Sequence, residues 1–357
     1  MSDALLEKFI REYIESQTGD EVMFLWHGGE PLLRPLSFYK KAMTLERKYG
    51  RGRQIANCLQ TNGTLLTSEW CRFLKNEGWL VGLSIDGTKE MHSRYRKNKG
   101  GDALYERLIE NIRMLQYYDV EWNAMVTVHQ GNVECGKELY HYLKDLGVQY
   151  IQLSPVVERK HEAGNLMSYT ESGNEETEES VTPEQWGHFL IDIFKEWVKA
   201  DVGNVFVEIF DCTLANWMGV APGICIFAED CGHAGVKEWN GDVYSCDHFV
   251  FPEYRLGNIY KESLLNMMYG AQQQTFSKIK RTFLSDQCKE CQWLFACHGE
   301  CPKNRFLTDS QGTAGLNYLC TGYKMYFDFV APYMDYMKHL LEEGKEASEI
   351  MLRTSTL

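Results

Sequence analysis

The stretch that decides the fold is Phe24-Leu25-Trp26-His27-Gly28-Gly29-Glu30-Pro31, in which a short apolar run stops at two glycines. The same pattern recurs twice along the chain. The apolar run 55–60 stops at Asn62-Gly63, and the run 80–85 stops at Asp86-Gly87. Short apolar runs that end at turn residues are typical of buried strands.

Helical patterns separate these strands. Residues 5–14 place their apolar side chains on one helical face. Further helices are predicted at 35–49, 103–118 and 133–146, and further strands at 122–128 and 150–154. Because parallel strands need helical crossovers, the alternation predicts an α/β fold with a helix-covered parallel sheet. We count five strands, and a helix precedes the first of them.

The second half of the chain has a different character. Residues 158–181 are polar and acidic and predict a solvated, mobile loop, after which Thr182-Pro183-Glu184-Gln185 has the signature of a capped helix start. From about residue 204 the chain is rich in turns and cysteines. We therefore predict a barrel domain at 1–200, a cysteine-rich domain at 201–330 and a terminal helix at 331–357.

Bulk properties exclude several classes of function. The net charge of −13 argues against a nucleic-acid partner, because phosphate binding needs a basic surface. No apolar run reaches the length of a membrane span, and the N-terminus lacks the features of a secretion signal. We therefore expect a cytoplasmic protein with no membrane partner, in a reducing compartment where disulfides are rare.

Eight of the twelve cysteines lie in one region of the C-terminal half: Cys225, Cys231, Cys246, Cys288, Cys291, Cys297, Cys301 and Cys320. Eight thiolates make two sets of four, which suits either two structural zinc ions or two four-iron clusters. The spacing alone does not choose between these metals. The other four, Cys58, Cys71, Cys135 and Cys212, are interpreted as small buried hydrophobic residues.

Polar residues at the predicted strand ends are candidates for ligand binding. Gly28 and Gly29 let a ligand approach the backbone, and Glu30 could bind an ammonium group. Ser84 and Arg96 could hold a ribose and a carboxylate, or only cap a helix and pair with an acid. Asp247, next to Cys246, is a candidate base, although a structural role is the commoner one for such a residue.

These motifs occur in one order that resembles the anaerobic sulfatase-maturating enzymes, which are radical S-adenosylmethionine (SAM) proteins with a cysteine-rich SPASM extension. The strand-end motifs already quoted carry part of the resemblance. The remainder is carried by Tyr244-Ser245-Cys246-Asp247, Arg255-Leu256-Gly257-Asn258-Ile259, Cys288-x2-Cys291-x5-Cys297-x3-Cys301-Pro302 and Asn317-Tyr318-Leu319-Cys320. The resemblance implies a partial (β/α)6 barrel followed by a SPASM domain, and it favours iron–sulfur over zinc.

The resemblance also implies roles for the candidate residues. One auxiliary [4Fe-4S] cluster is expected on Cys225, Cys231, Cys246 and Cys301, and a second on Cys288, Cys291, Cys297 and Cys320. Gly28, Gly29 and Glu30 would hold the amino end of SAM, with Ser84 and Arg96 as further contacts. Asp247 would be the base in the oxidation of a sulfatase Cys or Ser to formylglycine. Expected partners are a sulfatase polypeptide and an electron donor such as flavodoxin or ferredoxin.

One departure from the family pattern affects activity. The family's Cys-x3-Cys-x2-Cys motif, which holds the SAM-cleaving third cluster, does not occur in the 357 residues. We expect a truncated chain that lacks the first barrel strand, in preference to a degenerate paralogue, and we expect the chain as given to be inactive. The alternatives are a maturase of a ribosomal peptide and a non-catalytic, metal-stabilised binding module.

Overall fold

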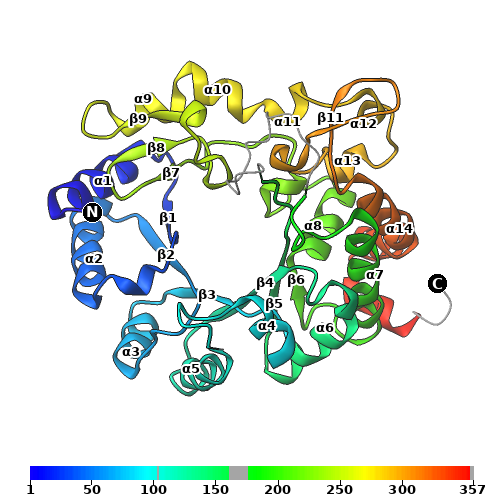
Figure 1. The fold of residues 1–357 in the computed structure, drawn as a ribbon, viewed down its shortest axis with the longest axis horizontal. Helices are drawn as coiled ribbons and strands as arrows, with labels where there is room; N and C mark the ends of the chain where they lie inside the picture. The colour runs from blue at the N-terminus through cyan, green and yellow to red at the C-terminus, as the bar shows by residue number, and fades with distance from the viewer. Residues whose placement is uncertain (103, 161–175, 354–357) are drawn as a thin grey trace. The chain divides into compact units, whose positions relative to one another are not determined.

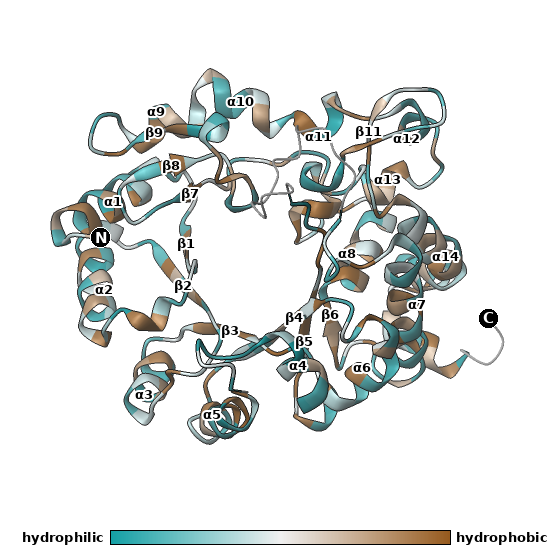
Figure 2. Ribbon diagram, viewed as in Figure 1, coloured by the Kyte–Doolittle hydropathy of each residue, from teal (hydrophilic) through white to brown (hydrophobic). Residues whose placement is uncertain are grey.

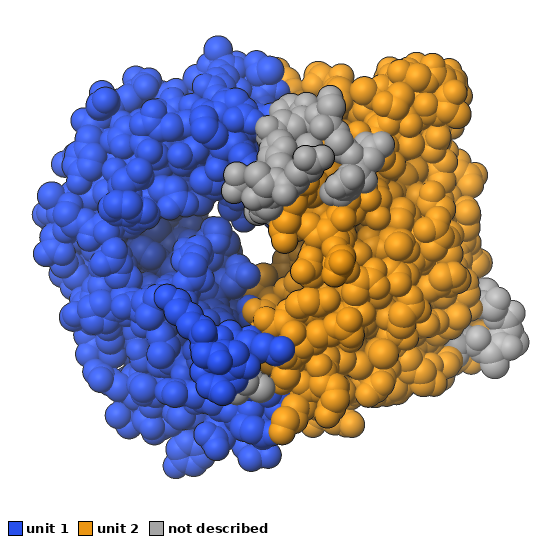
Figure 3. All heavy atoms as spheres, viewed as in Figure 1, with its two compact units in different colours: residues 1–84, 97–123, 232–277 blue, residues 85–96, 124–231, 278–357 orange. Residues whose placement is uncertain are grey.

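The structure is a computed structural model that describes residues 1–102, 104–160 and 176–353. The chain divides into two compact units, which Figure 3 shows in different colours. Unit 1 contains residues 1–84, 97–123 and 232–277, and unit 2 contains residues 85–96, 124–231 and 278–357. Both units therefore combine segments that are far apart in the sequence.

Six strands form a parallel sheet in chain order, and Figure 1 labels them β1 to β6. They are β1 (Glu21–Trp26), β2 (Gln54–Thr61), β3 (Leu80–Ser84), β4 (Trp122–Val128), β5 (Tyr150–Pro155) and β6 (Phe206–Val207). The pairs β1–β2, β2–β3, β4–β5 and β5–β6 are parallel, with Val22 opposite Ile55 in the first of them. The predicted α/β fold with a parallel sheet is confirmed.

The five predicted strands correspond to β1 to β5, and β6 was not predicted. This sixth strand has only two residues, Phe206 and Val207, so it shows no apolar alternation. It pairs through Tyr150 and Ile151 at the start of β5. Hydrophobic colour marks β4 and β6 in Figure 2, and Val126, Val128 and Val207 are buried.

In unit 1, helices α2, α3 and α5 lie on one side of strands β1 to β3 (Figure 1). Helix α1 packs Leu5 against Val243 of the small three-stranded sheet and against Ile259, directly after it. The elements of the unit besides β1 to β3 are α1 (Asp3–Ser16), α2 (Leu36–Gly50), α3 (Ser68–Asn76), α5 (Tyr105–Tyr117), β7 (Val236–Lys237), β8 (Asp242–Tyr244), β9 (Arg255–Asn258), α9 (Leu264–Tyr269) and α10 (Ala271–Ser277).

In unit 2, the long helices α7 and α14 pack on each other (Figure 1). The capping box predicted for α7 is present, since Thr182 Oγ1 accepts from Gln185 N and Gln185 Oε1 accepts from Thr182 N. The α-helices of the unit, and its strands besides β4 to β6, are α4 (Lys89–Tyr95), α6 (Gly136–Asp145), α7 (Pro183–Ala200), α8 (Glu208–Trp217), α11 (Ile279–Thr282), α12 (Asp286–Lys289), α13 (Leu294–Cys297), β10 (Leu307–Thr308), β11 (Ala314–Leu316) and α14 (Cys320–Glu342).

Part of the predicted acidic loop, residues 161–175, and the start of the predicted helix at Ala103 lie outside the described residues. The described ends of the acidic segment meet in a bridge between Arg159 and Glu176. No described helix is long and apolar enough to cross a bilayer. The predicted domain boundaries at residues 200 and 330 stay a prediction.

Candidate functional site

The turn after β1 has the backbone that the sequence predicted. Gly28 and Gly29 both have positive φ angles, of 91° and 55°, which a glycine adopts without strain. A Cβ atom at either position would meet nothing within 4 Å, so the backbone is open to a ligand. Both residues therefore suit the close approach predicted for them.

Glu30 ties this turn to the turn after β2. Its Oε1 atom accepts from Leu32 N (2.9 Å) and Thr61 Oγ1 (2.7 Å), and its Oε2 atom accepts from Asn62 N (3.0 Å). This structural role of Glu30 was not predicted from the sequence. A carboxylate has about four lone-pair sites, so one remains for the predicted ammonium contact.

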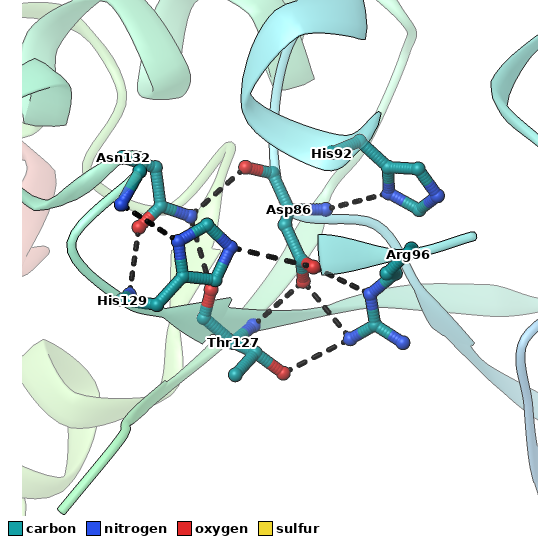
Figure 4. Close-up of polar contacts among 7 residues, drawn as sticks. Asp86, His92, Arg96, Thr127, His129 and Asn132 are labelled. Atoms are coloured by element: carbon teal, nitrogen blue, oxygen red, sulfur yellow. Dashed lines mark hydrogen bonds and ion pairs between the residues drawn. The ribbon is translucent and has the colours of Figure 1, made fainter. Parts of the chain in front are cut away.

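Arg96 belongs to a buried polar network in unit 2, shown in Figure 4. Its Nε atom donates to Asp86 Oδ2, and its Nη2 atom donates to Asp86 Oδ1 (3.0 Å) and Thr127 Oγ1 (2.9 Å). Asp86 is 1% exposed. Burial alone would raise the pKa of Asp86, but His129 and Arg96 outweigh it and lower that pKa to about 2.

Histidine and asparagine side chains complete this network (Figure 4). His129 Nδ1 accepts from Gly131 N (3.0 Å), so the ring proton lies on Nε2, which is 3.8 Å from Asp86 Oδ2. Asn132 Nδ2 donates to the carbonyl oxygens of Asp86 and Thr127 (both 3.0 Å). These contacts hold Asp86 in place. The ionised Asp86 carboxylate in turn binds one edge of the Arg96 guanidinium.

His129 and Asn132 were not predicted as members of this network. The available signal was their place directly after the strand 122–128, at the same edge of the sheet as the Asp86 turn. Arg96 was predicted either to bind a ligand or to pair with an acid, and in the structure it pairs with one. Ser84 is the last residue of β3 and lies in unit 1.

Asp247 lies at the surface of unit 1, next to Cys246. Its Oδ1 atom accepts from Cys246 Sγ (3.1 Å) and from His248 N (3.0 Å). Burial raises the pKa of Asp247, but His248, Cys246 and His27 together lower it below its usual value. His27 directly precedes Gly28, so the candidate base is electrostatically coupled to the turn that the sequence assigned to SAM.

The second predicted cysteine set surrounds one cavity in unit 2. Cys288, Cys291, Cys297 and Cys320 all line it, together with apolar side chains that include Trp293, Leu294 and Phe327. Burial and the neighbouring Cys320 raise the pKa of the Cys297 thiol to about 12. Four thiols that line one cavity suit a group that brings its own positive charge and deprotonates them.

The cysteine side chains of the described residues are not spaced to hold a single zinc ion. Zn–S bonds of about 2.3 Å would hold four sulfurs roughly 3.8 Å apart. Within residues 1–102, 104–160 and 176–353, no three His, Cys, Asp or Glu side chains are gathered to hold one metal ion. The same described residues, which include every cysteine, contain no disulfide bond.

Three members of the first predicted set, Cys225, Cys231 and Cys301, belong to unit 2. Cys231 interacts electrostatically with Cys225, and burial raises the pKa of the Cys231 thiol to about 11. The charge of Lys280 acts on both Cys231 and Cys301. The fourth predicted member, Cys246, belongs to unit 1, and its place in this set stays a prediction.

Comparisons with known proteins agree with this arrangement. Residues 1–143 match the Radical SAM superfamily, and residues 232–292 match SPASM, an iron–sulfur cluster-binding domain. The chain is 56% identical over 355 residues to a serine-type anaerobic sulfatase-maturating enzyme of Bacteroides thetaiotaomicron, covering 98% of this chain and 86% of that protein. It is 30% identical to a cysteine-type enzyme of Clostridium perfringens, covering 93% and 87%.

Solved structures show the same likeness. Native anSMEcpe with bound AdoMet and Kp18Cys peptide superposes with a TM-score of 0.84 at 29% identity, covering 95% of this chain and 91% of that one. Streptococcus suis SuiB bound to precursor peptide SuiA has a TM-score of 0.58 at 15% identity, covering 90% and 69%, which shows a shared fold alone.

Fold and matches together define a radical SAM enzyme with a SPASM iron–sulfur domain. Within that class, the chain belongs to the anaerobic sulfatase-maturating enzymes. The family and the fold class expected from the sequence are thereby confirmed.

Proposed function

We propose that this protein takes part in the oxidation of a sulfatase active-site Ser or Cys to formylglycine. The observation that carries the proposal is the 56% identity, over almost the whole chain, to a serine-type sulfatase-maturating enzyme. The placement of Asp247 beside Cys246, and its coupling to the turn after β1, supports a proton-accepting role near the cofactors.

The proposed reaction gives separate roles to the SAM-binding residues and to the base. Gly28, Gly29 and Glu30 hold the amino end of SAM, and Ser84 and Arg96 are further contacts. When bound, SAM supplies a 5′-deoxyadenosyl radical that takes one hydrogen atom from the target Cβ. Asp247 takes the proton of the target hydroxyl or thiol.

The oxidation balances on the target side chain. Loss of one hydrogen atom, one proton and one electron converts a serine CH2–OH directly to an aldehyde. The same losses convert a cysteine to a thioaldehyde, which water hydrolyses to the aldehyde and hydrogen sulfide. We assign the electron to an auxiliary cluster on the SPASM cysteines.

We propose two auxiliary [4Fe-4S] clusters, with SAM and a third cluster bound only where a Cys-x3-Cys-x2-Cys segment is present. That motif does not occur in residues 1–357, so these residues alone should not cleave SAM. We further propose a flavodoxin or ferredoxin as electron donor, a cytoplasmic location, and no nucleic-acid or membrane partner.

Anaerobic reconstitution tests the metal assignment first. Two clusters predict about eight irons with matching sulfide and a brown colour, whereas two zinc sites predict about two colourless ions. Zinc in place of iron would leave the binding-module alternative standing.

Activity is tested on the chain joined to an N-terminal Cys-x3-Cys-x2-Cys segment, with SAM, a reductant and a peptide carrying a Ser- or Cys-x-Pro-x-Arg target. We expect SAM cleavage and conversion of the target to an aldehyde by mass spectrometry. Asp247→Asn should keep the iron but lower the rate by roughly a hundredfold or more, the usual range for loss of a positioned base. An extended protein that loads iron yet never cleaves SAM would refute the proposed function.

A further inference from the structure

Two buried cations lie among the cysteines of unit 2. Lys280 and Arg305 are each 1% exposed. The charge of Arg305 acts on Cys288, Cys297 and Cys301, and that of Lys280 acts on Cys231 and Cys301. Lys280 thus acts on members of the first predicted set, and Arg305 acts on members of both sets.

Every N–H group of the Arg305 guanidinium donates to a backbone carbonyl oxygen. Nε donates to Gly299 O, Nη1 donates to Lys280 O and Phe283 O, and Nη2 donates to His298 O and Glu300 O, over 2.7–3.0 Å. All five N–H groups are used. None of these acceptors is a carboxylate, although the buried Glu300 side chain acts electrostatically on both Arg305 and Lys280.

Three of these carbonyl groups belong to the segment between Cys297 and Cys301. His298, Gly299 and Glu300 all have positive φ angles, of 46°, 71° and 55°. Each non-glycine residue in this region costs of order 1–3 kcal/mol unless its surroundings hold it there. Arg305 stabilises this left-handed conformation, because it binds the carbonyl oxygen of every residue in the segment.

The left-handed segment lies between two cysteines in the sequence, and only the first of them lines the cavity. Cys297 lines the cavity with Cys288, Cys291 and Cys320, whereas Cys301 is not among its lining residues. A Cβ atom on Gly299 would lie 2.6 Å from Arg305 Nη2, so the segment and the guanidinium are in close contact. Arg305 therefore binds the turn that links these two cysteines.

Lys280 is held in a similar way beside the first set. Its Nζ atom donates to Cys225 O (2.7 Å), Ile226 O (2.8 Å) and Ala228 O. Three acceptors around one nitrogen match the three donors of an ammonium group and leave no place for the lone pair of a neutral amine. Lys280 also offers its own carbonyl oxygen to Arg305.

We propose that Arg305 and Lys280 form a cationic divide between the two cluster sites. Arg305 is a positioning residue that sends Cys297 to one site and Cys301 to the other. Lys280, as a buried positive charge, raises the reduction potential of the cluster beside it, because added positive charge stabilises the more negative reduced form. The inference rests on the proposed cluster assignment.

The charge is tested on the whole chain after anaerobic reconstitution. Lys280→Met should keep about eight irons, as two four-iron clusters require. It should shift the reduction equilibrium of one cluster at least tenfold toward the oxidised form, which is 59 mV for one electron. Lys278→Met, at an exposed neighbouring lysine, is the matched control and should move neither midpoint in an EPR-monitored titration. Should Lys280→Met fail to fold by circular dichroism, Lys280→Gln removes the charge while keeping an N–H donor.

The positioning role is tested by Arg305→Lys, which keeps the charge but loses the five-donor fork. We expect folded protein with markedly lower iron occupancy. Full iron loading in this variant would overturn the positioning role, and unchanged midpoints in the folded, iron-loaded Lys280 variant would overturn the charge effect. If the unmodified chain takes up no iron, the cluster assignment itself fails and this inference falls with it.

Discussion

At the scale of single residues, Glu46 is a carboxyl group buried in the core of unit 1. Glu46 is 1% exposed, and its Oε2 atom accepts from Asn57 Nδ2 (2.8 Å). Among the described residues its Oε1 atom has no hydrogen-bond partner. Burial, only partly offset by Asn57, raises the pKa of Glu46 to about 7.

This shift makes the stability of the protein depend on pH. The carboxyl group of Glu46 ionises near pH 4.5 in the unfolded chain but near pH 7 in the folded one. Stability therefore falls as pH rises from about 4.5 to 7, because the unfolded state releases the proton first. A shift of this size corresponds to about 3 kcal/mol.

Glu46→Gln should remove this dependence, since an amide of the same shape does not ionise. We expect the variant to be more stable than the parent at pH 8 and close to it at pH 5, in urea unfolding followed by tryptophan fluorescence. Glu69→Gln, at a side chain that is 67% exposed, is the control. An equal effect of Glu46→Gln at both pH values would contradict the raised pKa.

Residue types identified the members of the candidate site better than they identified the hydrogen bonds between them. Cysteine and glycine can be recognised from the sequence because few residues replace them in their roles. The carboxylate of Glu30 was assigned to a ligand, yet it also binds Thr61 and Asn62 from the next strand end. Such partners are distant in sequence and follow only from the register of the sheet.

At the scale of elements, α7 and α14 cross at two glycines, Gly187 and Gly322. A Cβ atom on Gly322 would lie 2.0 Å from Pro183 O and 3.0 Å from Gly187 N. Both neighbours are backbone atoms and cannot rotate away. Helix α14 begins at Cys320, so this crossing also places a predicted cluster ligand.

Gly322→Ala should force the two helices apart. We expect a loss of at least about 2 kcal/mol of unfolding free energy, at the upper part of the range for overpacking. Iron in the second set should fall as well, because Cys320 moves with its helix. Gly50→Ala, at a helical glycine whose Cβ would meet only Ile55 at 3.5 Å, should cost little or nothing. Wild-type stability in Gly322→Ala would show that the crossing has room for a methyl group.

Elements with local signals were predicted and elements without them were missed. The cap at Thr182 is present, because a cap needs only a hydroxyl and a nearby backbone N–H. Strand β6 and helix α4 were not predicted. Both are short, and their conformations depend on the β5 edge and on the Asp86 turn respectively.

At the scale of the whole molecule, each compact unit is assembled from segments of both predicted domains. Unit 1 combines residues 1–84 with residues 232–277, and helix α1 packs directly on the small sheet there. Periodicity describes consecutive residues, so it gives no signal for such an association. The eight cysteines could be selected from the sequence, but the cavity that four of them line required the fold.

This organisation predicts that the two clusters load separately. All four cysteines of the second set belong to unit 2 and share one cavity, so removal of one of them should empty that site alone. Cys291→Ser should therefore lower the iron content from about eight to about four per chain, by colorimetric iron and sulfide analysis. Cys135→Ser, at a cysteine assigned no ligand role, should retain about eight. A loss of all iron in Cys291→Ser would mean that the first site cannot form without the second, and an unchanged content would remove Cys291 from the ligand set.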